Sequence, residues 1–155
     1  MNDRRRLLLA AAALLLPRRA PAAPSDSADD EALLADADYA AGRAALKAGQ
    51  PAAALARLQA ALKRFPDAAD LHSELGFTHR KLRQMEKAFE HYRRALALKP
   101  EHRGAHEYIG EAYLEVGDLA SAEKHLAALR KVCLLPCEEL EDLHKAIAAY
   151  RAGKR

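Results

Sequence analysis

The chain has 155 residues, of which 30% are charged and only 5% are aromatic, and its formal net charge is +3. This positive charge comes from the N-terminus, because residues 1–23 carry five arginines and one aspartate, whereas residues 24–155 hold 20 basic and 21 acidic residues. A nucleic-acid-binding domain needs a basic face and usually stacking aromatic residues. We therefore expect no nucleic-acid partner.

The N-terminal segment has the features of an export signal. Arg4, Arg5 and Arg6 precede an apolar run over residues 7–16, and small residues follow at 20–23. The run is too short to span a bilayer, which takes about 20 apolar residues, so we expect a signal peptide over residues 1–23. The arginines are also similar to a twin-arginine export signal. The mature chain is thus expected to be periplasmic or secreted, without stable insertion in the membrane after cleavage.

Beyond the signal, residues 24–30 are rich in Ser, Asp, Ala and Pro and are expected to form a short disordered linker. A domain is expected over residues 31–151. Within it, Gly42, Gly76 and Gly110 recur at intervals of 34 residues. Small, apolar and proline positions recur with the same period: Ala54, Ala88 and Ala122; Leu58, Tyr92 and Leu126; Ala61, Ala95 and Leu129; Pro66, Pro100 and Leu134.

This pattern resembles the tetratricopeptide repeat (TPR). The resemblance implies an all-α fold, an α-solenoid of three helix-turn-helix repeats over about residues 35–68, 69–102 and 103–134. Glycine and alanine at the recurring positions allow helix axes to approach within about 8 to 10 Å. Gly49 and Gly117 suit the left-handed end of a first helix, and Pro66 and Pro100 end the second helices of their repeats.

The third repeat ends differently, with Leu134 where proline is expected. Residues 137–151 then place Leu143, Ile147 and Tyr150 on one helical face. A solenoid needs a terminal element to cover its last apolar surface, so we expect a C-terminal capping helix here. The segment 129–150 also resembles the tail of small exported bacterial repeat proteins that have no assigned function.

In the TPR family, the first helices of the repeats line a concave groove that binds a partner peptide. Tyr39, Phe77 and Tyr108 are candidate anchors, because aromatic residues dominate interface hot spots; alternatively, they pack against the neighbouring repeat. The Lys and Asn constellation that clamps a C-terminal carboxylate is absent. The candidate groove residues are Tyr39, Arg43, Asp70, Ser73, Glu74, Phe77, Lys81, Glu107, Tyr108 and Glu111.

Cys133 and Cys137 are the only cysteines. In an exported protein such a pair is most simply a disulfide, and a turn between them can bring the Cα atoms to about 6 Å. Two alternatives remain open. Cys-x-x-x-Cys is similar to the copper-binding pair of some periplasmic copper-delivery proteins, with His125 or His144 as a third ligand, and a cysteine at a helix N-terminus suits thiol-redox chemistry.

Four histidines follow the repeat period, His72 with His106 and His91 with His125. Duplication accounts for them as packed or solvated helix positions. His102 and His106 are four residues apart, but no further ligand completes a zinc site, which takes three or four protein ligands. We expect no resident metal or cofactor.

No nucleophile elbow, phosphate loop or metalloprotease motif is found. The sequence therefore predicts a non-enzymatic scaffold or adaptor of the bacterial cell envelope that binds a protein or peptide in its groove. An accessory copper or redox factor acting through Cys133 and Cys137 is the alternative.

Overall fold

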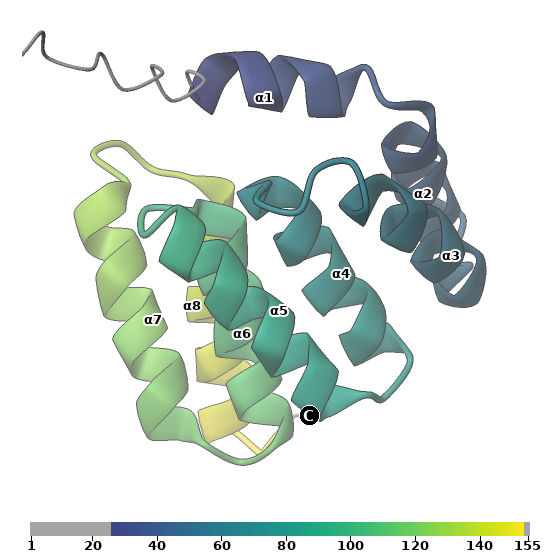
Figure 1. Cartoon of the computed structure of the whole chain (residues 1–155). Helices are drawn as coiled ribbons and strands as arrows, with labels where there is room; N and C mark the ends of the chain where they lie inside the picture. The colour runs from purple at the N-terminus through teal and green to yellow at the C-terminus, as the bar shows by residue number, and fades with distance from the viewer. Residues whose placement is uncertain (1–25, 154–155) are drawn as a thin grey trace, which may run out of the picture.

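The computed structural model describes residues 26–153, so the predicted signal peptide lies outside the described residues. This part of the chain is all-helical (Figure 1), and none of its helices is long and apolar enough to cross a membrane. The helices are α1 Asp26–Leu34, α2 Ala37–Lys47, α3 Pro51–Leu62, α4 Ala69–Lys81, α5 Met85–Leu98, α6 Arg103–Glu115, α7 Leu119–Val132 and α8 Glu138–Arg151.

Six of these helices form the three predicted repeats. The pairs α2 with α3, α4 with α5 and α6 with α7 pack as antiparallel hairpins that lie side by side in Figure 1. Gly49 and Gly117 have φ of 70° and 83° at the turns inside the first and third hairpins, as predicted, and Arg83 has φ of 61° at the corresponding turn of the second. The predicted α-solenoid is therefore confirmed.

Close helix packing depends on the recurring glycines. A Cβ atom added to Gly42 would lie 2.6 Å from Leu58 Cδ2, and one added to Gly76 would lie 2.5 Å from two ring carbons of Tyr92. Both facing side chains belong to the second helix of the same repeat, and both are fully buried. The glycines are thus required where a large side chain of the second helix fills the crossing.

The N-terminal helix α1 corrects one expectation. It begins at Asp26, so a disordered linker extending to Asp30 is wrong for Asp26–Asp30. Leu33 explains why the segment is ordered: this side chain is 1% exposed and belongs to the same buried cluster as Tyr39 and Leu58. Composition alone did not indicate that one leucine of this segment covers the first repeat.

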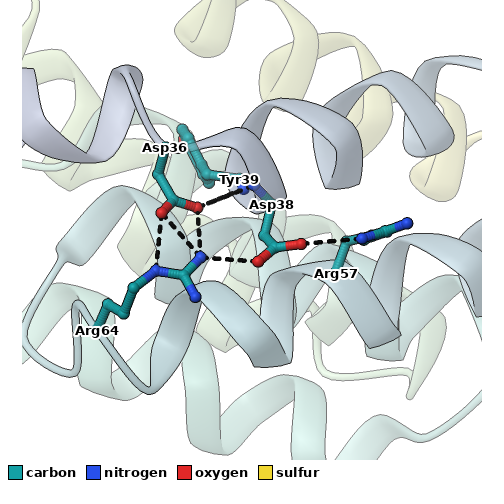
Figure 2. A network of polar contacts seen from close by, with 5 residues as sticks. All are labelled: Asp36, Asp38, Tyr39, Arg57 and Arg64. Atoms are coloured by element: carbon teal, nitrogen blue, oxygen red, sulfur yellow. Dashed lines mark hydrogen bonds and ion pairs between the residues drawn. The ribbon is translucent and has the colours of Figure 1, made fainter.

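The start of α2 is held by a network of polar contacts (Figure 2). Asp36 Oδ1 accepts hydrogen bonds from the backbone N–H groups of Asp38 at 3.0 Å and Tyr39 at 2.9 Å, which caps the helix. Arg64, beyond the end of α3, donates to Asp36 and Asp38, each at 2.8 Å. These hydrogen bonds lower the pKa values of both carboxyl groups and tie the two ends of the first repeat together.

Candidate functional site

The first helices of the repeats and the C-terminal helix form one surface, because α2 contacts α4, α4 contacts α6, and α6 contacts α8. A pocket of about 660 Å³ lies where α4, α6 and α8 meet near their C-terminal ends. It is lined by Arg80, Lys81, Arg83, Glu111, Leu114, Glu115, Ala146, Ala149 and Tyr150. Among the predicted groove residues, Lys81 and Glu111 line this pocket.

Arg80 lines the pocket, although its side chain is only 5% exposed. Its Nη2 donates to Glu111 Oε2 at 2.7 Å and its Nη1 donates to the carbonyl oxygen of Tyr108 at 3.4 Å. The guanidinium also lies 5.4 Å from the ring centre of Phe77. Arg80 therefore links α4 to α6 and holds Glu111 of α6 in a fixed position relative to Lys81 of α4.

Two aromatic residues of the predicted groove lie beside each other. The rings of Phe77 and Tyr108 are tilted, with centroids 5.1 Å apart, and both residues are half-buried. Lys81 Nζ lies 4.9 Å from the centre of the Phe77 ring, a cation–π contact. These residues form an apolar surface with an exposed cation next to it.

Tyr39 and Ser73 do not present their side chains to a partner, since each residue is 3% exposed. Tyr39 packs in the core of the first repeat, so its assignment as an anchor is wrong and the packing alternative holds for it. Leu33 of α1, which lies outside the repeat pattern, is buried in the same cluster. Ser73 is likewise buried in α4.

The remaining charged groove residues form pairs near the N-terminal half of α4. Arg43 Nε lies 3.5 Å from Glu74 Oε1, and His102 Nε2 lies 2.9 Å from Asp70 Oδ1. His102 also caps α6 by accepting the N–H of Ala105 at 3.1 Å. The hydrogen bond from His102 lowers the pKa of Asp70, so this part of the surface is occupied by internal polar contacts.

Glu107 differs from these carboxylates. It is half-buried on α6, one turn before Glu111, and no lysine, arginine or histidine of residues 26–153 lies within ion-pair distance of it. Burial raises the pKa of Glu107 to about 8, with further contributions from Glu111, Asp142 and Glu139. Glu107 is thus a carboxyl group that a cation from outside would stabilise in its charged form.

Sequence reasoning missed the contribution of α8 to this surface. Ala146, Ala149 and Tyr150 line the pocket, although the helix was interpreted only as a cap. The sequence did contain a signal for this contribution. The helix α8 directly follows the third repeat, in the place where the first helix of a fourth repeat would stand. The groove pattern could have been extended to it.

The cysteines are bonded to each other, with Cα atoms 6.0 Å apart, so the predicted disulfide is confirmed. In this form neither sulfur is a thiolate that could ligate copper. Of the two proposed additional ligands, His125 contacts His106 and His144 is exposed. Within residues 26–153, no group of three or more His, Cys, Asp or Glu side chains is arranged to hold a metal ion.

Helical hairpins stacked through glycine contacts and closed by a final helix define an α-solenoid repeat protein. Two sequence models described as Tetratricopeptide repeat match residues 39–102 and 79–132. The chain belongs to the tetratricopeptide repeat family. Repeats of this family act in general as protein-interaction scaffolds, typically without catalysis, and the chain is a scaffold in this broad sense.

The fold is similar to that in the crystal structure of the P58(IPK) TPR domain, with a TM-score of 0.61 and 22% sequence identity. The similarity covers 82% of this chain and 33% of the other, so the chain spans about a third of that structure. At this identity the likeness concerns the fold alone. No curated protein matches the sequence.

Proposed function

We propose that the protein is an exported, periplasmic or secreted adaptor that binds a segment of a partner protein in the groove formed by α4, α6 and α8. The observation that carries this proposal is the pocket of about 660 Å³ between these helices. Its volume falls within the range of about 300 to 1,000 Å³ that is usual for ligand sites. Two of the groove residues that the TPR resemblance implies, Lys81 and Glu111, line this pocket.

The walls of the pocket indicate the chemistry of the partner segment. Ala146, Ala149 and Leu114 supply an apolar wall, while Lys81 is exposed on the opposite helix. An apolar side chain of the partner would pack against α8 and exclude water there. Glu107, one helical turn from Glu111, would pair with a basic side chain of the same segment. We therefore assign the groove to a segment that combines an apolar residue with a basic one.

Export rests on the N-terminal sequence, in which arginines, an apolar run and small residues follow one another over residues 1–23. The disulfide supports the same assignment, because such bonds persist in oxidising compartments. N-terminal sequencing of the native protein should begin near Ala23 or Pro24. An intact Met1 in a cytoplasmic pool would contradict export.

The groove is tested by comparing two Ala→Trp variants of the mature chain. Ala149→Trp places a large ring in the pocket, whereas Ala127→Trp adds the same ring on the exposed side of α7. Crosslinking capture from an envelope extract should identify the partner with the unmodified chain. We expect Ala149→Trp to reduce capture about tenfold or more, the scale of a lost hot spot, and Ala127→Trp to leave it unchanged. Equal capture by both variants would place binding elsewhere.

A further inference from the structure

Two pairs of histidines face each other at the same place in the second and third repeats. His72 Nδ1 in α4 lies 3.0 Å from His91 Nδ1 in α5. In the next repeat, His106 Nδ1 in α6 lies 2.9 Å from His125 Nδ1 in α7. Each pair therefore joins the two helices of its repeat by a direct contact between imidazole rings.

The second nitrogen of the first histidine fixes the hydrogens in each pair. His72 Nε2 lies 2.9 Å from the carbonyl oxygen of Pro66, and His106 Nε2 lies 2.9 Å from that of Pro100. A carbonyl oxygen only accepts hydrogen bonds, so these Nε2 atoms donate. In a neutral ring, Nδ1 is then an acceptor, and the Nδ1–H of the other histidine donates to it.

The result is a chain of two hydrogen bonds in each repeat. In the second repeat it runs from His91 in α5 to His72 in α4 and on to Pro66, at the end of the preceding repeat. Each chain thus connects both helices of one repeat with the loop that enters it.

The first repeat has a different connection at the same positions. Asp38 and Arg57 are also 19 residues apart, and Arg57 Nη1 donates to Asp38 Oδ1 at 3.1 Å (Figure 2). All three repeats therefore have a polar contact between their helices here. It is ionic in the first repeat and consists of two imidazoles in the other two.

Protons affect the two kinds of contact differently. One added proton on the Nε2 of His91 leaves the hydrogen bond to His72 in place. A second proton puts N–H groups on both nitrogens, so the hydrogen bond is lost and two cations lie about 3 Å apart. The Asp38–Arg57 contact is formed by charged groups, and the hydrogen bond from Arg64 lowers the pKa of Asp38.

The surroundings of the pairs do not favour positive charge. Burial lowers the pKa values of His72 and His106, and burial together with the paired histidine lowers those of His91 and His125 to about 4. The charged and titratable groups near the first pair are His79, Asp67, Glu90 and Arg94, and those near the second are His102 and Lys124, with the Tyr113 ring stacked on His125.

We propose that the two histidine pairs form an acid-sensitive latch, which holds the helices of the second and third repeats together at neutral pH and releases them on acidification. The ionic contact keeps the first repeat closed over the same range. Because α4 and α6 form walls of the pocket, the latch makes the shape of the groove depend on pH. Release begins below the ordinary histidine pKa of 6.5 and extends toward the value of about 4 for His91 and His125.

Hydrogen exchange of the mature chain, measured at about pH 7.5 and about pH 5 and corrected for intrinsic exchange, tests the latch for each repeat. We expect protection to fall about tenfold or more in α4 to α7 relative to α2 and α3. The double variant His72→Asp with His91→Arg gives the second repeat the contact of the first. It should abolish the acid response of α4 and α5 and leave that of α6 and α7. His144→Asn, at an exposed histidine of α8, should leave both responses unchanged.

Equal loss of protection in all three repeats would overturn the latch, and so would an unchanged acid response of α4 and α5 in the double variant. If the double variant does not fold, an NMR titration of the histidines in the unmodified chain tests the latch instead. The four paired histidines should then take up protons below pH 6.5, with His91 and His125 near pH 4. Uptake by all four near 6.5 would show that the pairs do not act as a latch.

Discussion

The side chain of Leu143 fills the space beside Gly110. A Cβ atom added to Gly110 would lie 2.7 Å from Leu143 Cδ2, and Leu143 is fully buried. In the first two repeats the equivalent space is filled by a residue of the same repeat, Leu58 or Tyr92. The C-terminal helix therefore contributes to the third repeat a contact that second helices supply elsewhere.

Leu143→Ala should consequently destabilise the protein strongly. Loss of a buried leucine leaves a cavity and costs about 2 to 5 kcal/mol, and this cavity would lie between α6 and α8. His144→Ala, at the next residue but on the exposed face, should change stability little. Urea unfolding of both variants measures the difference. Similar midpoints would mean that α8 is not part of the cooperative fold.

Gly76→Ala should destabilise the second repeat. The new Cβ would lie 2.5 Å from the Tyr92 ring, which is fully buried, and overpacking costs about 1 to 3 kcal/mol. Gly104→Ala is the matched control, because its nearest neighbour would be at 3.5 Å. It should be neutral or stabilising by up to about 1 kcal/mol. Thermal melts with the reverse order would refute the packing argument.

The disulfide should be complete in native protein and structural in effect. A thiol assay of protein purified from the envelope should find no free thiol. Replacing Cys133 and Cys137 by serine should cost about 2 kcal/mol, because the bond closes a short loop, and should leave partner capture intact. Two free thiols with stoichiometric Cu(I) uptake, lost in His125→Ala or His144→Ala, would instead favour the copper function.

Partner binding should tighten as pH rises if a basic side chain pairs with Glu107. Below its pKa of about 8 the carboxyl group is protonated and neutral, whereas a cation favours the carboxylate, so binding at neutral pH releases a proton. The affinity should rise by up to about tenfold per pH unit below that pKa and then level off. Glu107→Gln should bind more weakly above pH 8 and lose this dependence. Titration calorimetry in buffers of different ionisation enthalpy counts the proton, and a count of zero would contradict the pairing.

The repeats were predictable because helix crossings impose local requirements on residue size. Gly42 and Gly76 recur with one period since each faces a large side chain of the next helix at the same crossing. The disulfide was predictable because the chain was expected to be exported and a turn between cysteines four residues apart can bring their Cα atoms to about 6 Å.

Other features depend on elements outside the period. Tyr39 is buried in a cluster that includes Leu33 of α1, and Ala149 of α8 lines the same pocket as Lys81. The histidine pairs are an intermediate case. Duplication of His72 and His91 in the next repeat was visible in the sequence, but the contact between them requires knowledge of how the two helices face each other.

The contrast between the connections of the repeats has a consequence for ionic strength. Arg57 and Arg64 have side chains 61% and 47% exposed, so dissolved ions can screen their attraction to Asp38. A hydrogen bond between neutral imidazoles has no net charge to screen. Salt should thus weaken the Asp38 contacts of the N-terminal repeat more than the histidine pairs of the other two repeats, whereas acid should act in the opposite order. Salt and acid would then act at equivalent positions of different repeats.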